Sequence, residues 1–250
     1  MKQEIKTNSI KNKIYNFLKN ETSNWSKLEI LWLAIASFTI VALSIYWQDT
    51  LMGIISSLTG VVCVICTGKG KLSAYIFGFI NCLLYAIISY KAGYYGETLL
   101  NGIYYLPLQF YGFYVWNKNM NEDTKEVNKR HMTNKQRLIL LCSIIIGTYL
   151  LGLFLNFLGG NIPFIDAFST ASSIIAMIIS IGMFSEQWWI WIVVDVVTVY
   201  MWFLNFQQGN ENIATLIMWC VYLLNAIFMC YKWETNIKIQ KGAINTKFNI

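Results

Sequence analysis

The sequence predicts an all-α polytopic membrane protein with eight transmembrane helices, and three observations lead to that prediction. Only 13% of the residues are charged, whereas soluble domains carry roughly 25%. The charges gather into short clusters, with long apolar runs between them. A helix that rises 1.5 Å per residue needs about 20 residues to cross roughly 30 Å of hydrocarbon, which is the length of these runs. A membrane β-barrel would instead show weakly alternating segments of about ten residues.

Each predicted helix corresponds to one apolar run. The run at 187–210 is interrupted only by Asp195, and the other runs contain no Asp, Glu, Lys or Arg. The polar, lysine-rich residues 1–28 lack the short apolar core of a signal peptide. In chain order the predicted helices are 30–48, 50–68, 72–90, 98–117, 138–165, 167–185, 187–210 and 212–231.

The distribution of positive charge predicts the orientation. With a cytoplasmic N-terminus, all of the 19 Lys and Arg residues except Lys91 fall on the inner side, as the positive-inside rule requires. Both termini are therefore expected in the cytoplasm, and the charged loop is expected to be a solvated tether. The predicted parts are a cytoplasmic tail (1–28), an extra transmembrane helix (29–48), a first three-helix bundle (50–117), a cytoplasmic loop (118–137), a connector helix (138–160), a second three-helix bundle (166–232) and a cytoplasmic tail (233–250).

The two bundles look alike in sequence. Asn81 and Asp195 lie near the midpoints of their spans, and each bundle closes with an amide followed by a Trp: Gln109 and Trp116, then Asn225 and Trp233. Because corresponding helices lie four spans apart, the bundles have the same orientation and form a parallel repeat in a 3+1+3 arrangement. This arrangement resembles that of SWEET-like transporters, whose substrate sites lie near the midplane.

Asp195 is the most informative residue, because a carboxylate at the centre of a membrane helix costs about 2.5–3.5 kcal/mol and usually marks a transport pathway. Trp188, Trp191 and Trp202 share its face of the helix. Indoles beside an acid favour a flat ligand that is cationic or rich in hydroxyls. A structural carboxyl bonded to a neighbouring helix remains the alternative, and Trp188 and Trp202 also suit membrane–water interfaces.

The helix at 72–90 is expected to provide the facing wall of a midplane pocket. Asn81 and Tyr85 share one side of it, while Gln109 and Asn225 lie within other apolar spans. Each amide could contact a ligand or bond helices together. No nucleophile–base pair and no metal-ligand cluster is evident in the sequence, so we expect binding without catalysis and no cofactor or metal. A non-enzymatic membrane receptor or scaffold is an alternative from a different class.

The sequence resembles the PnuC-type family of transporters for nicotinamide riboside and related vitamins over residues 50–235. The segment 186–195 (Glu-Gln-Trp-Trp-Ile-Trp-Ile-Val-Val-Asp) looks like the family signature, in which two Trp residues separated by two positions precede an Asn or Asp. Similar runs are 77–81, 106–109 with Gly112 and Trp116, and 225–233.

This resemblance implies facilitated diffusion across the bacterial inner membrane, trapping of the substrate by an intracellular kinase, and a homotrimer. By matching position, it places substrate contacts at Gln109, Trp188, Trp191, Asp195 and Asn225, with Asn81 as a further candidate. Relatives with this architecture carry thiamine, riboflavin or deoxynucleosides. Nicotinamide riboside and thiamine are cations, which fits an acid among indoles better than neutral riboflavin does, so nicotinamide riboside is the expected substrate.

Overall fold

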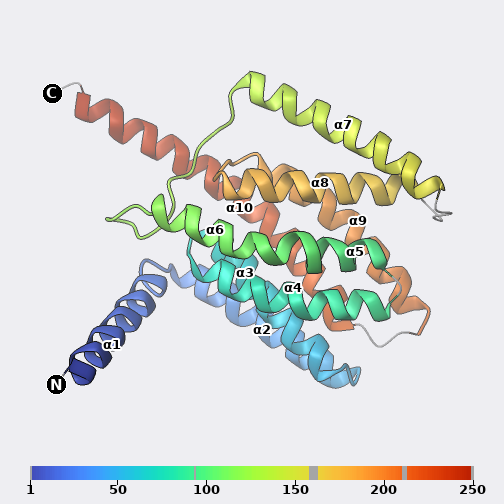
Figure 1. Cartoon of the computed structure of the whole chain (residues 1–250), viewed down its shortest axis with the longest axis horizontal. Coiled ribbons are helices and arrows are strands. Elements are labelled where there is room, and N and C mark those ends of the chain that lie inside the picture. The colour runs from blue at the N-terminus through green and yellow to red at the C-terminus, as the bar shows by residue number, and fades with distance from the viewer. Residues whose placement is uncertain (1, 93, 158–162, 210–212, 249–250) are drawn as a thin grey trace.

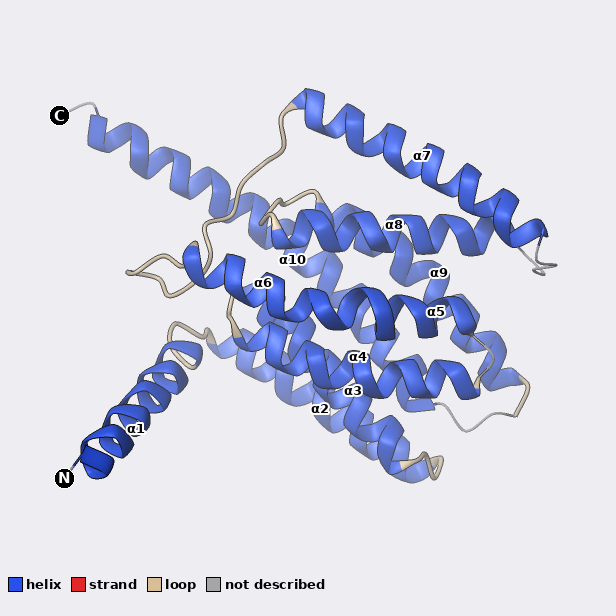
Figure 2. Ribbon diagram, viewed as in Figure 1, coloured by secondary structure: helices blue, strands red, loops and turns tan. Residues whose placement is uncertain are grey.

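The computed structural model describes the chain except residues 1, 93, 158–162, 210–212 and 249–250, and in this part every named element is a helix (Figures 1 and 2). The all-α membrane fold is confirmed. Seven described helices are long and apolar enough to cross a membrane. They are α2 (Lys27–Tyr46), α3 (Leu51–Lys69), α4 (Ser73–Lys91), α7 (Asn134–Phe157), α8 (Pro163–Ile181), α9 (Gln187–Gln207) and the Ile213–Ile239 part of α10 (Ile213–Phe248).

The predicted span at 98–117 is occupied by three consecutive helical pieces: α5 (Tyr95–Leu99), a π-helical segment η1 (Leu100–Tyr105) and α6 (Leu106–Lys118). Pro107 explains the interruption, because a proline has no N–H to donate and its ring clashes with the carbonyl four residues earlier. The N–H of Leu106 instead bonds to the carbonyl of Asn101, five residues back. A count of eight spanning helices therefore depends on these pieces acting as one span.

Local sequence signals place the ends of several helices. Ser26 and Glu29 form a capping box that starts α2, and Thr50 caps α3 by accepting a bond from the N–H of Gly53. Gly70 ends α3 with a φ of 81°, a conformation that glycine adopts without steric cost. The two tails are also helical: α1 covers Lys2–Glu21, and α10 continues past Tyr231, where the predicted span ends, to Phe248.

The helices form two sets that meet around the centre of the molecule. In the first set α4 packs against α3 and against α5, η1 and α6, while in the second set α9 packs against α8 and α10. The sets meet where α10 contacts α3 and where α8 contacts the α5–η1–α6 pieces. α2 packs on α3 and α10, and α7 packs on α8 at the edge of the molecule (Figure 1).

The closing Trp residues of the two sets make equivalent contacts in opposite directions. The indole N–H of Trp116 donates to the carbonyl of Ser180 on α8 at 3.3 Å, and that of Trp233 donates to the carbonyl of Gly68 on α3 at 2.7 Å. Each indole is fully buried and meets an aromatic ring near the start of its own set's middle helix, Tyr75 or Trp188, in a T-shaped contact. These contacts are compatible with the predicted parallel repeat, which stays a prediction.

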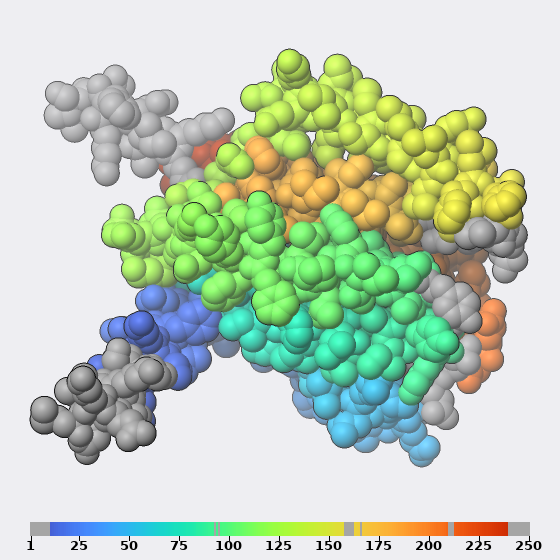
Figure 3. All heavy atoms as spheres, in the orientation of Figure 1, coloured from blue at the N-terminus to red at the C-terminus, as the bar shows by residue number. Residues whose placement is uncertain are grey.

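Apolar side chains cover the outer surface of the helices. Gly152 is the one buried residue of α7, while Leu138, Ile145, Leu150 and Phe154 are each more than half exposed. A whole helix with exposed apolar side chains is rare on a soluble monomer. Such a surface suits contact with lipid tails. In Figure 3, α7 forms one whole edge of the molecule.

The polar loop between α6 and α7, residues 119–133, is attached to both sets of helices, in contrast to the expected solvated tether. We call it the strap. The N–H of Val127 donates to the carbonyl of Gly70 at 3.1 Å, in the turn between α3 and α4. The N–H of Arg130 donates to the carbonyl of Met183 at 3.1 Å, and the N–H of Ser185 donates to the carbonyl of Arg130 at 2.9 Å. Both of these bonds join the strap to the turn between α8 and α9.

Glu186 holds the end of the strap. Its carboxylate accepts bonds from the backbone N–H of Met132 at 3.1 Å and from the guanidinium of Arg137 at 2.9 and 2.7 Å. Both guanidinium nitrogens donate to the same carboxylate oxygen, Oε1, and such charge-assisted hydrogen bonds are stronger than neutral ones. The strap therefore closes one end of the molecule across the junction of the two sets.

Candidate functional site

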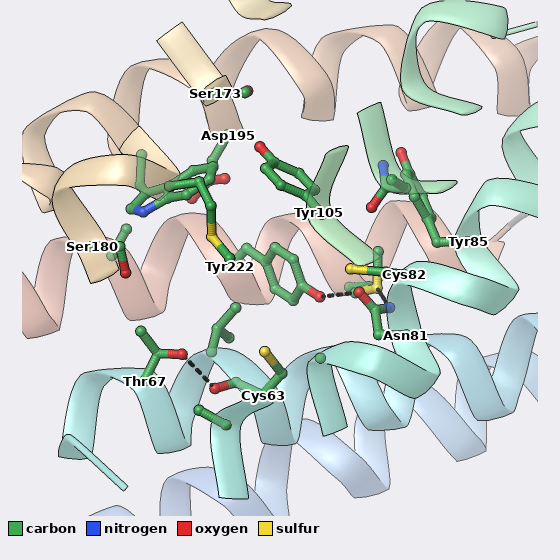
Figure 4. A pocket seen from close by; sticks show the side chains of 18 of the residues that line it. Cys63, Thr67, Asn81, Cys82, Tyr85, Tyr105, Ser173, Ser180, Asp195 and Tyr222 are labelled. Atoms are coloured by element: carbon green, nitrogen blue, oxygen red, sulfur yellow. Dashed lines mark hydrogen bonds between the residues drawn. The ribbon is translucent and has the colours of Figure 1, made fainter. Parts of the chain in front are cut away.

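A cavity of about 130 Å³ lies between the two sets of helices, and both sets supply its walls (Figure 4). α3, α4, α5, η1 and α6 contribute side chains from the first set, and α8, α9 and α10 from the second. A single water needs about 10–15 Å³ of such cavity volume, so the cavity has room for a small molecule.

Most of the residues predicted from the sequence lie around this cavity. The structure brings together one acid, three amides, one phenol and two indoles from four helical segments. Trp202 is not among the described residues that line it. The predicted residues in the lining are Asn81, Tyr85, Gln109, Trp188, Trp191, Asp195 and Asn225.

Asp195 lies in the middle of α9 and is 3% exposed. No described residue forms a hydrogen bond or an ion pair with its carboxylate. Buried carboxylates in proteins are normally paired, so the absence of a partner among the described residues argues against the structural alternative, in which Asp195 bonds a neighbouring helix. Across the cavity the Tyr105 hydroxyl points toward Asp195 (Figure 4), and this hydroxyl is also buried without a hydrogen-bond partner in the described part of the chain.

The two lining indoles differ in their surroundings. Trp188 is 3% exposed and packs edge-to-face on Trp233, with ring centroids 5.6 Å apart. Its indole N–H finds no acceptor among the described side chains and backbone. Trp191 lies one turn further along α9 and is only partly buried. An indole N–H and an aromatic face are thus available beside the carboxylate.

Trp202 acts on the cavity through Tyr85. The Tyr85 hydroxyl accepts two bonds, from the indole N–H of Trp202 at 2.9 Å and from that of Trp219 at 3.1 Å. Two indoles from different helices therefore fix the phenol that lines the cavity. Trp202 is fully buried and contacts Tyr85 but is not among the described lining residues, so its predicted contact with the substrate stays a prediction.

The amides both join helices and face the cavity. Asn81 donates to the carbonyl of Ser56 at 2.9 Å, and Asn225 donates to the carbonyl of Val64 at 3.2 Å, so each bonds its own helix to α3. The carbonyl oxygen of Asn225 has no donor among the described residues. The two readings offered by the sequence, ligand contact and interhelical bond, are therefore compatible for Asn225.

The pieces α5, η1 and α6 add three lining residues that are not among the predicted site residues: Glu97, Asn101 and Tyr105. Glu97, Asn101, Tyr105 and Gln109 are spaced by four and all line the cavity. In a regular α-helix three such steps would rotate the last residue about 120° away from the first. The wider π turn, with its bonds to the fifth residue, offsets this rotation. Pro107 is the signal in the sequence that points to this irregular segment.

The charge of the cavity is one-sided. Two carboxylates, Glu97 and Asp195, are among the described residues that line it, and no Lys, Arg or His is. The side-chain amide of Asn101 donates to the backbone carbonyl of Glu97 at 2.9 Å and to its carboxylate at 3.4 Å. The cavity therefore attracts a cation and repels an anion.

The sequence matches the family described as nicotinamide mononucleotide transporter over residues 50–235, a region that holds every residue named above as lining the cavity. The chain belongs to this family. It is 33% identical over 87% of its length to a protein of Neisseria mucosa and 32% identical over 88% to one of Haemophilus influenzae, covering 85% and 96% of those proteins. Both are named nicotinamide riboside transporter PnuC.

A solved structure has the same fold. The crystal structure of the vitamin B3 transporter PnuC superimposes with a TM-score of 0.81 at 32% identity and covers 89% of this chain and 97% of its own. The resemblance inferred from the signature at 186–195 is thereby confirmed. The cavity belongs to a membrane transporter fold.

Proposed function

We propose that the protein is a facilitated-diffusion transporter that imports nicotinamide riboside across the bacterial inner membrane. One observation carries the proposal: a buried carboxylate without a described partner, Asp195, faces a cavity whose described lining contains no basic side chain. The pyridinium of nicotinamide riboside supplies the missing positive charge. Its flat ring suits the indoles, and a cation over an indole contributes about 2 kcal/mol when desolvated.

The charge of the cavity also selects between the riboside and its mononucleotide. A mononucleotide carries a phosphate with a charge of about −1.5 to −2 at pH 7. That phosphate would have to enter a buried site that offers two carboxylates and, in its described lining, no counter-charge. The names of the similar proteins from Neisseria mucosa and Haemophilus influenzae point the same way. Phosphorylation inside the cell would then trap the substrate.

Alternating access accounts for movement without a coupling ion. The cavity lies where the two sets of helices meet, so that rocking one set against the other exposes it to either side of the membrane. We place both termini in the cytoplasm, because nearly all Lys and Arg residues lie on that side. A homotrimer is the proposed assembly.

The test is uptake by proteoliposomes that contain the purified protein. Labelled nicotinamide riboside should equilibrate across the membrane without ATP or an ion gradient, and unlabelled riboside should compete while the mononucleotide should not. Dependence on ATP or on an ion gradient would reject facilitated diffusion. Absence of any saturable binding would reject transport and favour a receptor or scaffold.

Thiamine is the second candidate, because it is also a flat cation and satisfies the same carboxylate. A thermal-shift series separates the two, since a ligand at 100 times its dissociation constant raises stability by about 2.7 kcal/mol. At equal ligand concentration, the ligand with the larger shift in melting temperature is the one that binds more tightly. Riboflavin, which is neutral, should give the smallest shift of the three.

A further inference from the structure

A second pocket of about 350 Å³ lies away from the transport cavity, between the strap and α10. Its walls come from four segments: the turn between α1 and α2 (Asn24), the end of α3 (Lys69), the strap (Thr124, Glu126 and Lys129) and α10 (Lys232 and Asn236). Three ammonium groups thus face one hollow at the end of the molecule that the strap closes.

One of the three ammonium groups is fully paired. Lys69 is 5% exposed, and its Nζ bonds to the carbonyl of Asn24 and contacts the carboxylates of Glu29 at 3.1 Å and Glu126 at 3.0 Å. An ammonium has three N–H donors, so these acceptors use all of them. Lys69 therefore has a structural role in holding the pocket together.

The other two ammonium groups have unused donors. The side chain of Lys129 is 1% exposed, and Glu126, at 3.0 Å, is its one hydrogen-bond acceptor in the described part of the chain; its Nζ also lies 5.5 Å from the centre of the Trp233 ring. Lys232 also has one described acceptor, Glu29, but its side chain is 22% exposed, so the cost of an unsatisfied donor falls mainly on Lys129. A buried donor left unsatisfied costs about 1–3 kcal/mol, and more when it is charged. The contents of the pocket have to supply the missing acceptors.

The charge of the pocket is also incompletely balanced. Lys69, Lys129 and Lys232 face the two carboxylates of Glu29 and Glu126, which leaves one positive charge in excess. Burial lowers the pKa of Lys129 even though Glu126 beside it acts to raise the pKa. The present partners thus compensate only partly for the water that this ammonium has lost.

We propose that this pocket binds a phosphate group. A phosphate presents several strong acceptor oxygens on one compact centre, which matches two partly satisfied ammonium groups better than a single carboxylate would. The amide of Asn236 and the hydroxyl of Thr124 add neutral donors to the same wall. This proposal rests on the polar packing of this end of the molecule and is independent of the identity of the transported substrate.

Two sources could provide the phosphate: a free phosphate compound or the headgroup of an anionic lipid. Basic pockets between membrane helices bind such headgroups, and this pocket is bounded by α3 and α10. In either case the ligand joins the strap to α10, because Lys129 belongs to one and Lys232 to the other. A bound phosphate would therefore add to the bonds that attach the strap to the helices.

The experiment measures phosphate binding to the purified full-length protein by calorimetry, with inorganic phosphate as the probe and chloride at matched ionic strength as reference. Lys232→Gln should weaken binding at least tenfold, and Lys129→Gln should do the same while Lys129→Arg retains it. Lys118→Gln is the matched control, because Lys118 is exposed, lies outside the described lining of the pocket and contacts the ring of Tyr114. Normal transport by Lys232→Gln would show that the variant is folded.

A second arm uses nanodiscs made of phosphatidylcholine with or without phosphatidylglycerol, and follows the melting temperature. Stabilisation by phosphatidylglycerol that Lys232→Gln abolishes would support the proposal and identify a lipid headgroup as the source. Inorganic phosphate can also stabilise a protein without binding to it, because it is excluded from the protein surface, so the comparison with Lys232→Gln decides whether the pocket is involved. A stabilisation or binding signal unchanged in Lys232→Gln, or no signal in either arm, would overturn the proposal and leave a water-filled pocket.

Discussion

Replacing Asp195 with Asn tests whether its charge recognises the substrate. The substitution keeps the shape of the side chain and removes only the negative charge. Asp195 is 3% exposed without a described partner, so the variant loses a desolvation cost in the free protein. We therefore expect Asp195→Asn to fold normally and to melt at the same temperature as the wild type or higher.

The size of the effect on binding follows from the dimensions of the cavity. A sphere of 130 Å³ is about 6 Å across, so a bound cation lies roughly 4–6 Å from the carboxylate, where opposite charges attract by about 3–4 kcal/mol at an effective dielectric constant of 20. Water retained in the cavity lowers this value. We expect the dissociation constant of nicotinamide riboside to rise about 10- to 100-fold, which corresponds to about 1.4–2.7 kcal/mol.

The assay compares nicotinamide riboside with its reduced dihydro form, which keeps the amide and the ribose but is uncharged. Calorimetry on wild type and Asp195→Asn should show that the variant loses affinity for the cation and keeps its affinity for the neutral compound. An equal loss for both ligands would mean that Asp195 acts through shape or hydrogen bonding. Undiminished binding of the cation would refute the electrostatic reasoning altogether.

Three further substitutions test the surroundings of the site. Gly78→Ala should lower substrate affinity without unfolding the protein, because the added Cβ would lie 2.6 Å from Oε1 of Gln109, whereas Gly102→Ala, whose nearest contact would be at 3.6 Å, should bind normally in the same titration. Tyr85→Phe should lower the free energy of unfolding by about 2 kcal/mol or more, because it leaves two buried indole N–H groups without their acceptor; an unchanged melting temperature would contradict this. Glu186→Gln should make the strap more sensitive to trypsin, since it weakens the bonds that hold residues 132–137, and a wild-type digestion rate would show that those bonds do not restrain it.

The membrane fold could be predicted from the sequence because its cause is local. Each spanning helix needs an apolar run of sufficient length, and such runs are visible without any tertiary contact. Interruptions within helices and the ends of helices are harder to predict from the sequence. Pro107 indicates an irregular helix, but the sequence does not state whether the chain will kink or form a π turn there. The continuation of α10 beyond Tyr231 was missed, because polar residues on a helix that leaves the membrane look like a tail.

The candidate site was partly predictable for a related reason. A carboxylate inside an apolar run stands out from its neighbours, so Asp195 and the indoles on its face could be found from spacing alone. The contact of Trp202 with Tyr85 could not be predicted, because it depends on how α9 packs against α4. Glu97 was missed because burial at a helix end depends on the neighbouring elements. Lys69 and Lys129 are buried for the same reason.

The π turn at η1 has a consequence for how this helix tolerates changes in length. A turn closed by a bond to the fifth residue contains one residue more than an α-helical turn, so deleting one residue between 100 and 105 should convert the segment into ordinary α-helix. Glu97 and Gln109 would then be eleven residues apart, a net rotation of about 20° in an α-helix, so both would stay on the face that lines the cavity. A single deletion in this turn should thus leave the span and the far wall of the cavity in register, which makes it a point where related chains can differ in length by one residue without losing their ligand or their fold.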